Sequence, residues 1–381
     1  MIALGFVLLF LNTKNVKEDT RLRLLGLLAG LAILNRMDTA LLYIPALLYL
    51  FLTRRSWRTV GLILAGFLPF LVWEVFSVIY YGFPLPNTFY AKLNTAISLR
   101  TMLQQGAMYY LDSFIWDPLT LVTIALALFF SLKDKQHLML GIGIGLYLFY
   151  VLLIGGDFMS GRFFSVALLI SAALLMRQVQ SLGLASKFIL LVVVIFLGLN
   201  APIPSFNVPV KRSIPTDDLS GVGDEQAWYF PYTGLVNWGR YHPLPDPNQE
   251  WIKLAGQLRS TGEKVYIGKG IGFLGYYAGP RVHIIDMFAI GDPLLARLPI
   301  AADKTWRIGH FKRDIPLGYE QSFRDNKNDL KNAALIEYYD HLRLIISGPL
   351  WSGERWLAIW KMNTGQYNYL LNSYLKSTMA H

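Results

Sequence analysis

The first 200 residues carry long apolar runs, and this feature most limits what the chain can fold into. We predict eight membrane segments, at residues 1–11, 24–35, 40–52, 59–79, 115–132, 137–154, 162–177 and 187–201. A helix needs about 20 apolar residues to cross the hydrocarbon core of a bilayer, and the runs 24–35 and 40–52 are shorter. Short paired segments are typical of broken or re-entrant helices around a site. The sequence therefore predicts a multi-pass α-helical membrane domain.

From about Pro202 the composition becomes that of a water-soluble domain. Residues 202–381 hold 20 lysines and arginines and 17 aspartates and glutamates, a balance typical of a solvated surface. Residues 202–250 are rich in proline, glycine and aromatic residues and predict a long irregular connection, or a lid over a membrane site. We therefore expect a transmembrane domain at 1–201, this connection at 202–250, and a small extracytoplasmic α/β domain at 251–381.

Short apolar runs predict the elements of that last domain. We expect strands at 264–268, 281–286 and 343–347, and helices at 270–279, 292–299 and 334–342. Alternation of this kind favours a small α/β fold. The glycines at 268, 270 and 272 do not have the spacing of a dinucleotide-binding fingerprint.

Basic residues set the expected orientation, because cytoplasmic loops carry an excess of lysine and arginine. With the first loop inside, eleven basic loop residues are cytoplasmic: Lys14, Lys17, Arg21, Arg23, Arg54, Arg55, Arg58, Lys133, Lys135, Arg177 and Lys187. Four are outside: Arg36, Lys92, Arg100 and Arg162. This bias predicts a plasma (inner) membrane protein whose 202–381 portion is extracytoplasmic. It also accounts for much of the net charge of +10, so no nucleic-acid partner is expected.

Composition excludes several kinds of site. The chain has no cysteine, which excludes disulfides, thiolate nucleophiles and cysteine-type zinc sites. His283 and His310 are too scattered for a metal cluster. We expect no metal site and no cofactor, and the sequence leaves a requirement for a divalent metal open.

Four motifs break the apolar pattern on the expected outer side. They are "LNRMDTA" (34–40) with Arg36 and Asp38, "YYGFPLPNTFYAKL" (80–93) with Asn87, Tyr90 and Lys92, "LDSFIWDP" (111–118) with Asp112 and Asp117, and "GGDFMSGRFF" (155–164) with Asp157 and Arg162. The cations Arg36, Lys92 and Arg162 could converge on a lipid phosphate, for which arginine offers a planar fork. The carboxylates could hold sugar hydroxyl groups or accept a proton.

Simpler interpretations stay open beside this one. Arg162 could be an ordinary helix-end residue, or it could form a surface ion pair with Asp157. Against a plain ion pair, the glycines at 155, 156 and 161 suit close approach of backbone to a ligand. The aromatic residues of these motifs could be interfacial anchors.

These motifs, with the later run "GIGFLGYYAGPRVHIIDMFAIGDPLLARLP", resemble multi-pass membrane glycosyltransferases of the GT-C type. The similarity extends from "LAILNRMD" to about Tyr319 and is greatest to the terminal β-(1→2)-arabinofuranosyltransferase group and its bacterial relatives. It implies a polyprenyl-phosphate sugar donor and an extracytoplasmic glycan acceptor, with Asn87, Tyr90, Lys92, Asp157 and Arg162 in the site. The catalytic aspartate of such enzymes lies in the first outer loop. That loop, with the helix before it, is expected upstream of Met1, so the catalytic base is not assigned.

The leading hypothesis is therefore a membrane glycosyltransferase that moves a sugar from polyprenyl phosphate to a cell-envelope glycan. The sugar could be arabinofuranose or another pentose or hexose. The donor-binding candidates are Arg36, Asp38, Asn87, Tyr90, Lys92, Asp157 and Arg162. The alternative is a non-catalytic membrane protein that binds lipid or glycan. A transporter is disfavoured by the large outer domain and the few charges within the spans.

Overall fold

The computed structural model describes residues 1–12, 16–93, 95–180, 182–200, 221–225, 229–230, 235, 249–301 and 306–379. The chain packs into two compact units, one of residues 1–73 with 98–228 and the other of residues 74–97 with 229–381. Each unit has its own buried apolar core.

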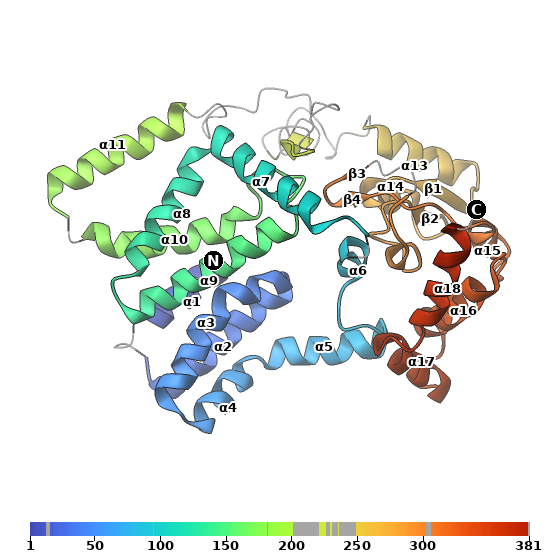
Figure 1. Ribbon diagram of the computed structural model, residues 1–381, viewed down its shortest axis with the longest axis horizontal. Coiled ribbons are helices and arrows are strands. Elements are labelled where there is room, and N and C mark those ends of the chain that lie inside the picture. The colour runs from blue at the N-terminus through green and yellow to red at the C-terminus, as the bar shows by residue number, and fades with distance from the viewer. Residues whose placement is uncertain are drawn as a thin grey trace. The chain divides into compact units, whose positions relative to one another are not determined.

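The described part of the first unit is helical. Its helices are α1 (Ile2–Leu11), α2 (Glu18–Asn35), the short 3-10 helix η1 (Met37–Thr39), α3 (Ala40–Arg54), α4 (Trp57–Gly66), α7 (Leu99–Trp116), α8 (Pro118–Ser131), α9 (Lys135–Leu153), α10 (Phe164–Gln180) and α11 (Leu184–Asn200). A further helix, α5 (Leu68–Tyr80), begins in this unit and ends in the second. Helix α8 packs against both α9 and α10 (Figure 1).

The apolar segments form helices, but fewer of them are full spans than the eight segments suggest. In the described chain, the segments Met37–Arg54 and Lys135–Leu153 are long and apolar enough to cross a membrane. Two bent pairs raise the number to four if each pair is one span: α4 with α5, bent by 63°, and α7 with α8, bent by 108°. The segments expected to be broken helices, 24–35 and 40–52, instead lie in α2 and in the long segment Met37–Arg54. The breaks fall inside two other predicted segments, near Phe67 in 59–79 and near Asp117 in 115–132.

Small residues let helices of the first unit approach closely. A Cβ atom added to Gly26 of α2 would lie 2.2 Å from the carbonyl oxygen of Ile63 in α4. A Cβ atom added to Gly66 would lie 2.1 Å from the carbonyl oxygen of Arg23. Small residues at helix contacts are typical of membrane proteins, where close backbone packing replaces the hydrophobic effect. The pair Gly26 and Gly66 thus fixes α2 against α4.

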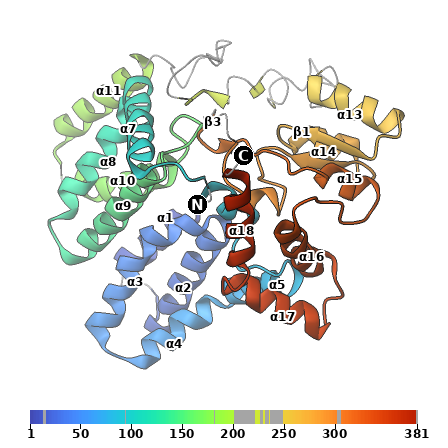
Figure 2. The ribbon, with the colours of Figure 1, turned by 45° about the vertical axis from the view of Figure 1, so that its right-hand side comes forward.

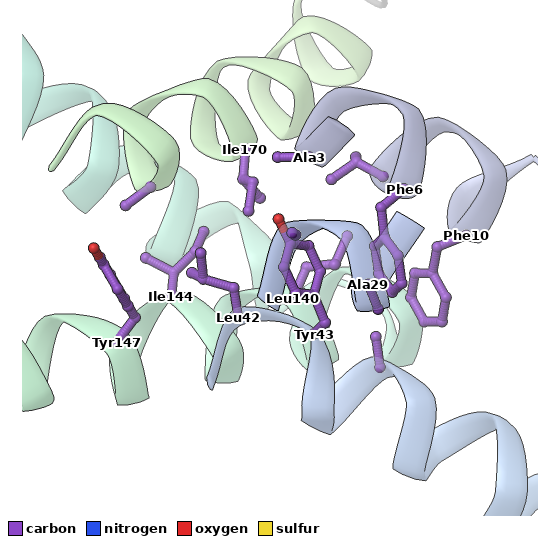
Figure 3. Packing of buried hydrophobic residues seen from close by; sticks show 14 of the residues in the cluster. Ala3, Phe6, Phe10, Ala29, Leu42, Tyr43, Leu140, Ile144, Tyr147 and Ile170 are labelled. Atoms are coloured by element: carbon purple, nitrogen blue, oxygen red, sulfur yellow. The ribbon is translucent and has the colours of Figure 1, made fainter. Parts of the chain in front are cut away.

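The core of the first unit gathers side chains from distant parts of the chain (Figure 3). Phe6 of α1 meets the edge of Tyr43 in α3, with ring centroids 4.7 Å apart. Leu140 of α9 and Ile170 of α10 are buried in the same cluster. By contrast, α11 exposes apolar side chains along its length, Phe188 among them. A helix with such a surface is suited to contact with lipid.

The described part of the second unit is mainly helical, with two small sheets. Strand β1 (Val265–Gly268) pairs in parallel with β2 (His283–Asp286), and α14 (Gly272–Ala278) connects them. Strands β3 (Trp306–Arg307) and β4 (His310–Phe311) are antiparallel. The helices are α6 (Asn87–Leu93), α13 (Glu250–Ser260), the 3-10 helix η3 (Leu295–Arg297), α15 (Tyr319–Arg324), α16 (Ala333–Ser347), α17 (Gly353–Asn363) and α18 (Asn368–Met379). Helix α16 packs against α17 and α18 (Figure 2).

The structure confirms the two strands expected at 264–268 and 281–286 and the helix between them. The helix expected at 292–299 is the short η3. The strand expected at 343–347 is wrong, because these residues continue α16. Leu335, Tyr338, Leu342 and Ile345 recur at helical spacing and bury one face of that helix.

Buried side chains tie residues 74–97 to the C-terminal part of the chain. Arg355 donates hydrogen bonds to the carbonyl oxygens of Ile79 (2.8 Å) and Tyr80 (3.0 Å), at the end of α5. Arg313 donates to the carbonyl oxygen of Ala91 in α6 at 2.6 Å. Arginine suits helix C-termini, where the last carbonyl groups have no partner within the helix. The motif 80–93 therefore packs with the second unit.

The domain boundaries expected at 201 and 250 remain predictions, because most of residues 201–248 lie outside the described part of the chain.

Candidate functional site

The turn between α9 and α10 carries Asp157 and Arg162. Two glycines of positive φ, Gly155 (81°) and Gly156 (72°), follow the end of helix α9. The amide of Gly156 donates to the carbonyl oxygen of Val151 at 2.9 Å, which closes the helix end. Glycine is the usual residue at such ends because its backbone adopts positive φ without strain. A Cβ atom on Gly156 would also lie 2.4 Å from the ring of Tyr109, so both glycines have structural causes.

Asp157 and Arg162 form an ion pair across this turn. The Nε atom of Arg162 lies 2.5 Å from Oδ2 of Asp157. The aspartate side chain is 1% exposed and the arginine side chain 40% exposed. Nη1 of Arg162 also contacts the sulfur atom of Met159 at 3.3 Å. The carboxylate is therefore inside the protein and holds a guanidinium group that reaches solvent.

A second arginine–aspartate pair lies where α2 gives way to η1. Arg36 donates from Nε to Oδ1 of Asp38 (3.1 Å) and from Nη2 to Oδ2 (2.5 Å). This two-point contact fixes the plane of the guanidinium group. The fold positions Arg36 because α2 ends at Asn35 and the chain turns back into α3.

The two pairs meet at the ring of Phe163. The guanidinium carbon of Arg36 lies 4.3 Å from the ring centroid, and that of Arg162 lies 5.5 Å from it. Arg36 also interacts electrostatically with Asp157. We call Arg36, Asp38, Asp157, Arg162 and Phe163 the arginine cluster. The structure thus brings together four predicted site residues that are far apart in the sequence.

Each guanidinium group in the arginine cluster keeps hydrogen-bonding capacity. An arginine has five N–H donors. In the described chain, Nη1 of Arg36 and Nη2 of Arg162 have no hydrogen-bond acceptor. The aspartates therefore orient the two cations and leave one edge of each for a further acceptor.

Neighbouring residues that the sequence did not single out support the turn. The hydroxyl group of Tyr109 in α7 accepts a hydrogen bond from the amide of Phe163 at 3.0 Å. Ser160 donates to Oδ2 of Asp112 at 2.5 Å, which gives that predicted acid a structural partner. The backbone of Gly223 bonds to Phe158 and Ser160 (2.9 and 3.1 Å). Tyr109 could have been found only by recognising residues 99–116 as a helix.

The remaining candidates lie in the second unit. The side-chain nitrogen of Asn87, Nδ2, donates to the backbone carbonyl oxygens of Ala289, Ile290 and Asp292, at 3.0, 3.0 and 3.1 Å. This gives Asn87 a structural role, fixing α6 to the loop after β2. That Asn87 belongs to the donor site remains a prediction, as it does for Tyr90 and Lys92 on the same helix.

Tyr90 and Lys92 differ in their surroundings. The ring of Tyr90 is partly buried beside Arg297, and burial raises the pKa of its hydroxyl group. Lys92 is exposed and interacts electrostatically with His310. Burial lowers the pKa of His310 to about 4, with a smaller contribution from Lys92. His310 is therefore neutral near pH 7.

Asp117 has a local partner as well. Its carboxylate accepts a hydrogen bond from the hydroxyl group of Thr120 at 2.5 Å, at the start of α8. Among the described residues, no three or more histidine, cysteine, aspartate or glutamate side chains lie together so that they could bind a metal ion. In the described part of the first unit, the arginine cluster is the site that brings predicted donor-binding residues together.

Comparison with known proteins gives one match. Residues 1–81 match the family model described as dolichyl-phosphate-mannose-protein mannosyltransferase. The match includes Arg36 and Asp38. No curated protein and no solved structure matches the chain. The match and the apolar helices together support a helical membrane protein.

Proposed function

We propose that the protein is a membrane glycosyltransferase of the GT-C type that uses a polyprenyl-phosphate sugar as donor. The observation that carries the proposal is the arginine cluster, in which Arg36 and Arg162 share the ring of Phe163 and each keeps a guanidinium edge for an acceptor. The family match over residues 1–81 supports the same class of donor, because the matched family is described by a dolichyl-phosphate sugar.

The cluster suits a phosphate in its charge and in its geometry. Arginine binds phosphate through parallel N–H donors, and such charge-assisted hydrogen bonds are stronger than neutral ones. Asp38 and Asp157 hold the guanidinium groups in place, so less side-chain entropy is lost when the phosphate binds. The apolar helices of the same unit suit the lipid chain.

In the proposed reaction an acceptor hydroxyl group attacks the anomeric carbon of the donor sugar. A new C–O bond forms as the bond between that carbon and the phosphate oxygen breaks, and the polyprenyl phosphate leaves with the bonding electrons. The proton of the acceptor hydroxyl group passes to a general base, which is not assigned to a residue of this sequence. Arg36 and Arg162 stabilise the negative charge that develops on the departing phosphate.

The donor sugar and acceptor are the finer part of the proposal. The resemblance of the outer-side motifs favours arabinofuranose, whereas the matched family is described by mannose. We propose a cell-envelope glycan as acceptor and an extracytoplasmic site in the plasma membrane, because the basic loop residues place the polar motifs on the outer side.

The test is a transfer assay with the full-length chain in lipid nanodiscs. Labelled polyprenyl-phosphate mannose and polyprenyl-phosphate arabinofuranose are supplied separately with a cell-envelope glycan fraction. We expect transfer from one of them, and a loss of roughly 10–100-fold in kcat/KM for Arg36→Gln and Arg162→Gln, the range of one charge-assisted contact.

Arg54→Gln is the matched control, because Arg54 also pairs with a carboxylate, Glu18 at 2.6 Å, away from the arginine cluster. It should transfer as the wild type does. If the folded protein moves neither sugar, the enzymatic proposal fails. Retained binding of the lipid in that case would favour the non-catalytic alternative.

A further inference from the structure

A cavity of about 520 Å³ is formed by residues of the second unit, whereas the arginine cluster belongs to the first. It is open to solvent, and its lining residues come mainly from α6, η3, α16, the end of α17 and α18. The residues that matter for its chemistry are Phe83, Tyr90, Arg297, Asn363, Asn368 and Asn372. This volume falls in the range of small-molecule sites.

Among the described residues that line the cavity, Arg297 carries the one formal charge, and none is aspartate, glutamate or lysine. Its side chain is 8% exposed. The guanidinium carbon lies 4.3 Å from the ring centroid of Phe83 and 4.5 Å from that of Tyr90. The two aromatic contacts hold the cation in position and stabilise its charge in part.

Arg297 forms no ion pair with a carboxylate in the described part of the chain. Its hydrogen bond runs from Nη1 to the carbonyl oxygen of Pro293, at 2.6 Å. Asp292 is close enough to interact electrostatically, but its carboxylate already accepts from the amides of Leu294 and Leu295 and from Tyr319. Buried charges are normally paired. The guanidinium group therefore faces the cavity with donors that an anionic ligand would satisfy.

The cavity lining also offers neutral hydrogen-bonding groups. Asn363, Asn368 and Asn372 line it near the turn from α17 to α18. The amide nitrogen of Asn363 donates to the carbonyl oxygens of Gly82 (2.8 Å) and Ile359 (2.9 Å), so its carbonyl oxygen is left for another donor. An amide both donates and accepts, which matches the hydroxyl groups of a sugar.

We propose that this cavity binds an anionic saccharide, whose carboxylate or phosphate group contacts Arg297 and whose hydroxyl groups contact the asparagines. This goes beyond the proposed transfer reaction, because the binding requires no lipid donor. A chain that transfers no sugar would still bind the saccharide.

The test measures binding to the full-length protein by ligand-observed NMR and calorimetry. The probes are methyl glucuronide, methyl glucoside, glucose 6-phosphate and inorganic phosphate. We expect at least one anionic sugar to bind at least tenfold more tightly than the neutral glucoside and than phosphate alone. The better of the two anionic sugars identifies the acid group, carboxylate or phosphate.

Two variants test the residues. Arg297→Met removes the charge and keeps an apolar side chain against the rings, and it should weaken binding of the anionic sugar at least tenfold. Asn372→Asp is nearly isosteric at an exposed position and should also weaken it, because it places a carboxylate in the cavity. Arg343→Met is the control, since Arg343 lies over the ring of Tyr339 at 5.9 Å and does not line the cavity.

Equal affinity for the glucuronide, glucose 6-phosphate and the glucoside would overturn the proposal. So would phosphate alone binding as tightly as the better of the two anionic sugars, since that would indicate a plain ion site. If Arg297→Met proves unstable, the Asn372→Asp result decides. Unchanged binding by Asn372→Asp would place the ligand elsewhere.

Discussion

At the scale of single residues, Asp157 and Arg162 combine two roles that the sequence presents as alternatives. They form an ion pair, as the simpler interpretation expects. Arg162 also lies over the ring of Phe163, as Arg36 does, so that two cations are close together as a phosphate site would need. The glycines beside them are weaker support for a ligand than the sequence suggests, because Gly155 and Gly156 close a helix and Gly156 packs on Tyr109.

The different roles of these glycines lead to a stability prediction. Gly156→Ala should lower the free energy of unfolding by about 2–4 kcal/mol, because its Cβ atom would clash with the ring of Tyr109 and its φ of 72° strains an alanine. Gly161→Ala is the control: its φ is 67° but its Cβ atom meets open space, so a cost of about 1 kcal/mol is expected. Thermal unfolding in detergent measures both, and equal effects would contradict the packing explanation.

A second residue-scale prediction concerns Asp292. Burial raises the pKa of its carboxyl group from near 4 to about 6, although hydrogen bonds from two amides and Tyr319 oppose the shift. The folded state therefore holds a proton that the unfolded state has lost between pH 4 and 6. The stability from this group is complete below about pH 4 and is lost as the pH rises through 6.

Asp292→Asn keeps the shape of the side chain and does not titrate. The free energy of unfolding of the wild type, relative to this variant, should fall by roughly 2 kcal/mol from pH 4 to pH 7. Unfolding curves of both proteins across that range test it. A constant difference would show that Asp292 has an ordinary pKa in the folded protein.

At the scale of elements, hydrogen bonds to backbone carbonyl groups fix α6. Asn87→Ala removes three such bonds and should destabilise the protein by about 2 kcal/mol. Asn372→Ala, at an exposed position on α18, should cost little. If Asn87→Ala instead kept its stability and lost only transfer activity, Asn87 would belong to the donor site and not to the scaffold.

Local pattern predicted elements well where few tertiary contacts decide the structure. The strands at 264–268 and 281–286 follow from their apolar, β-branched residues. Residues 343–347 have the same composition, yet they form the end of α16, because Leu342 and Ile345 continue the buried face of that helix. Residues 99–116 form α7 although they are too polar to be recognised as a membrane segment.

The candidate site could be predicted from the sequence only in part, because tertiary packing brings its residues together. Arg36 and Arg162 were identifiable as charges in apolar surroundings. Their meeting on Phe163 depends on how α2, α9 and α10 pack, which no local pattern contains. Arg297 was not identifiable either, since its burial arises from the packing of η3 against α6.

At the scale of the whole molecule, the first test is orientation. A fluorescent protein that matures only in the cytoplasm should stay dark when fused after His381 and become bright when fused at Ser56, because the excess of basic residues in the expected inner loops predicts that the C-terminal part is outside. A bright C-terminal fusion with a dark fusion at Ser56 would invert the orientation, and the proposed outer site with it.

The central claim, that the arginine cluster binds a lipid phosphate, is tested most directly by comparing two lipids. Polyprenyl phosphate and the neutral polyprenol are titrated into the full-length protein in nanodiscs, for the wild type and for the swapped variant Asp157→Arg/Arg162→Asp. The wild type should prefer the phosphate at least tenfold, and the swap should abolish that preference by placing a carboxylate against the anion. A swapped variant that keeps the preference would show that the ion pair of Asp157 and Arg162 has a structural role only.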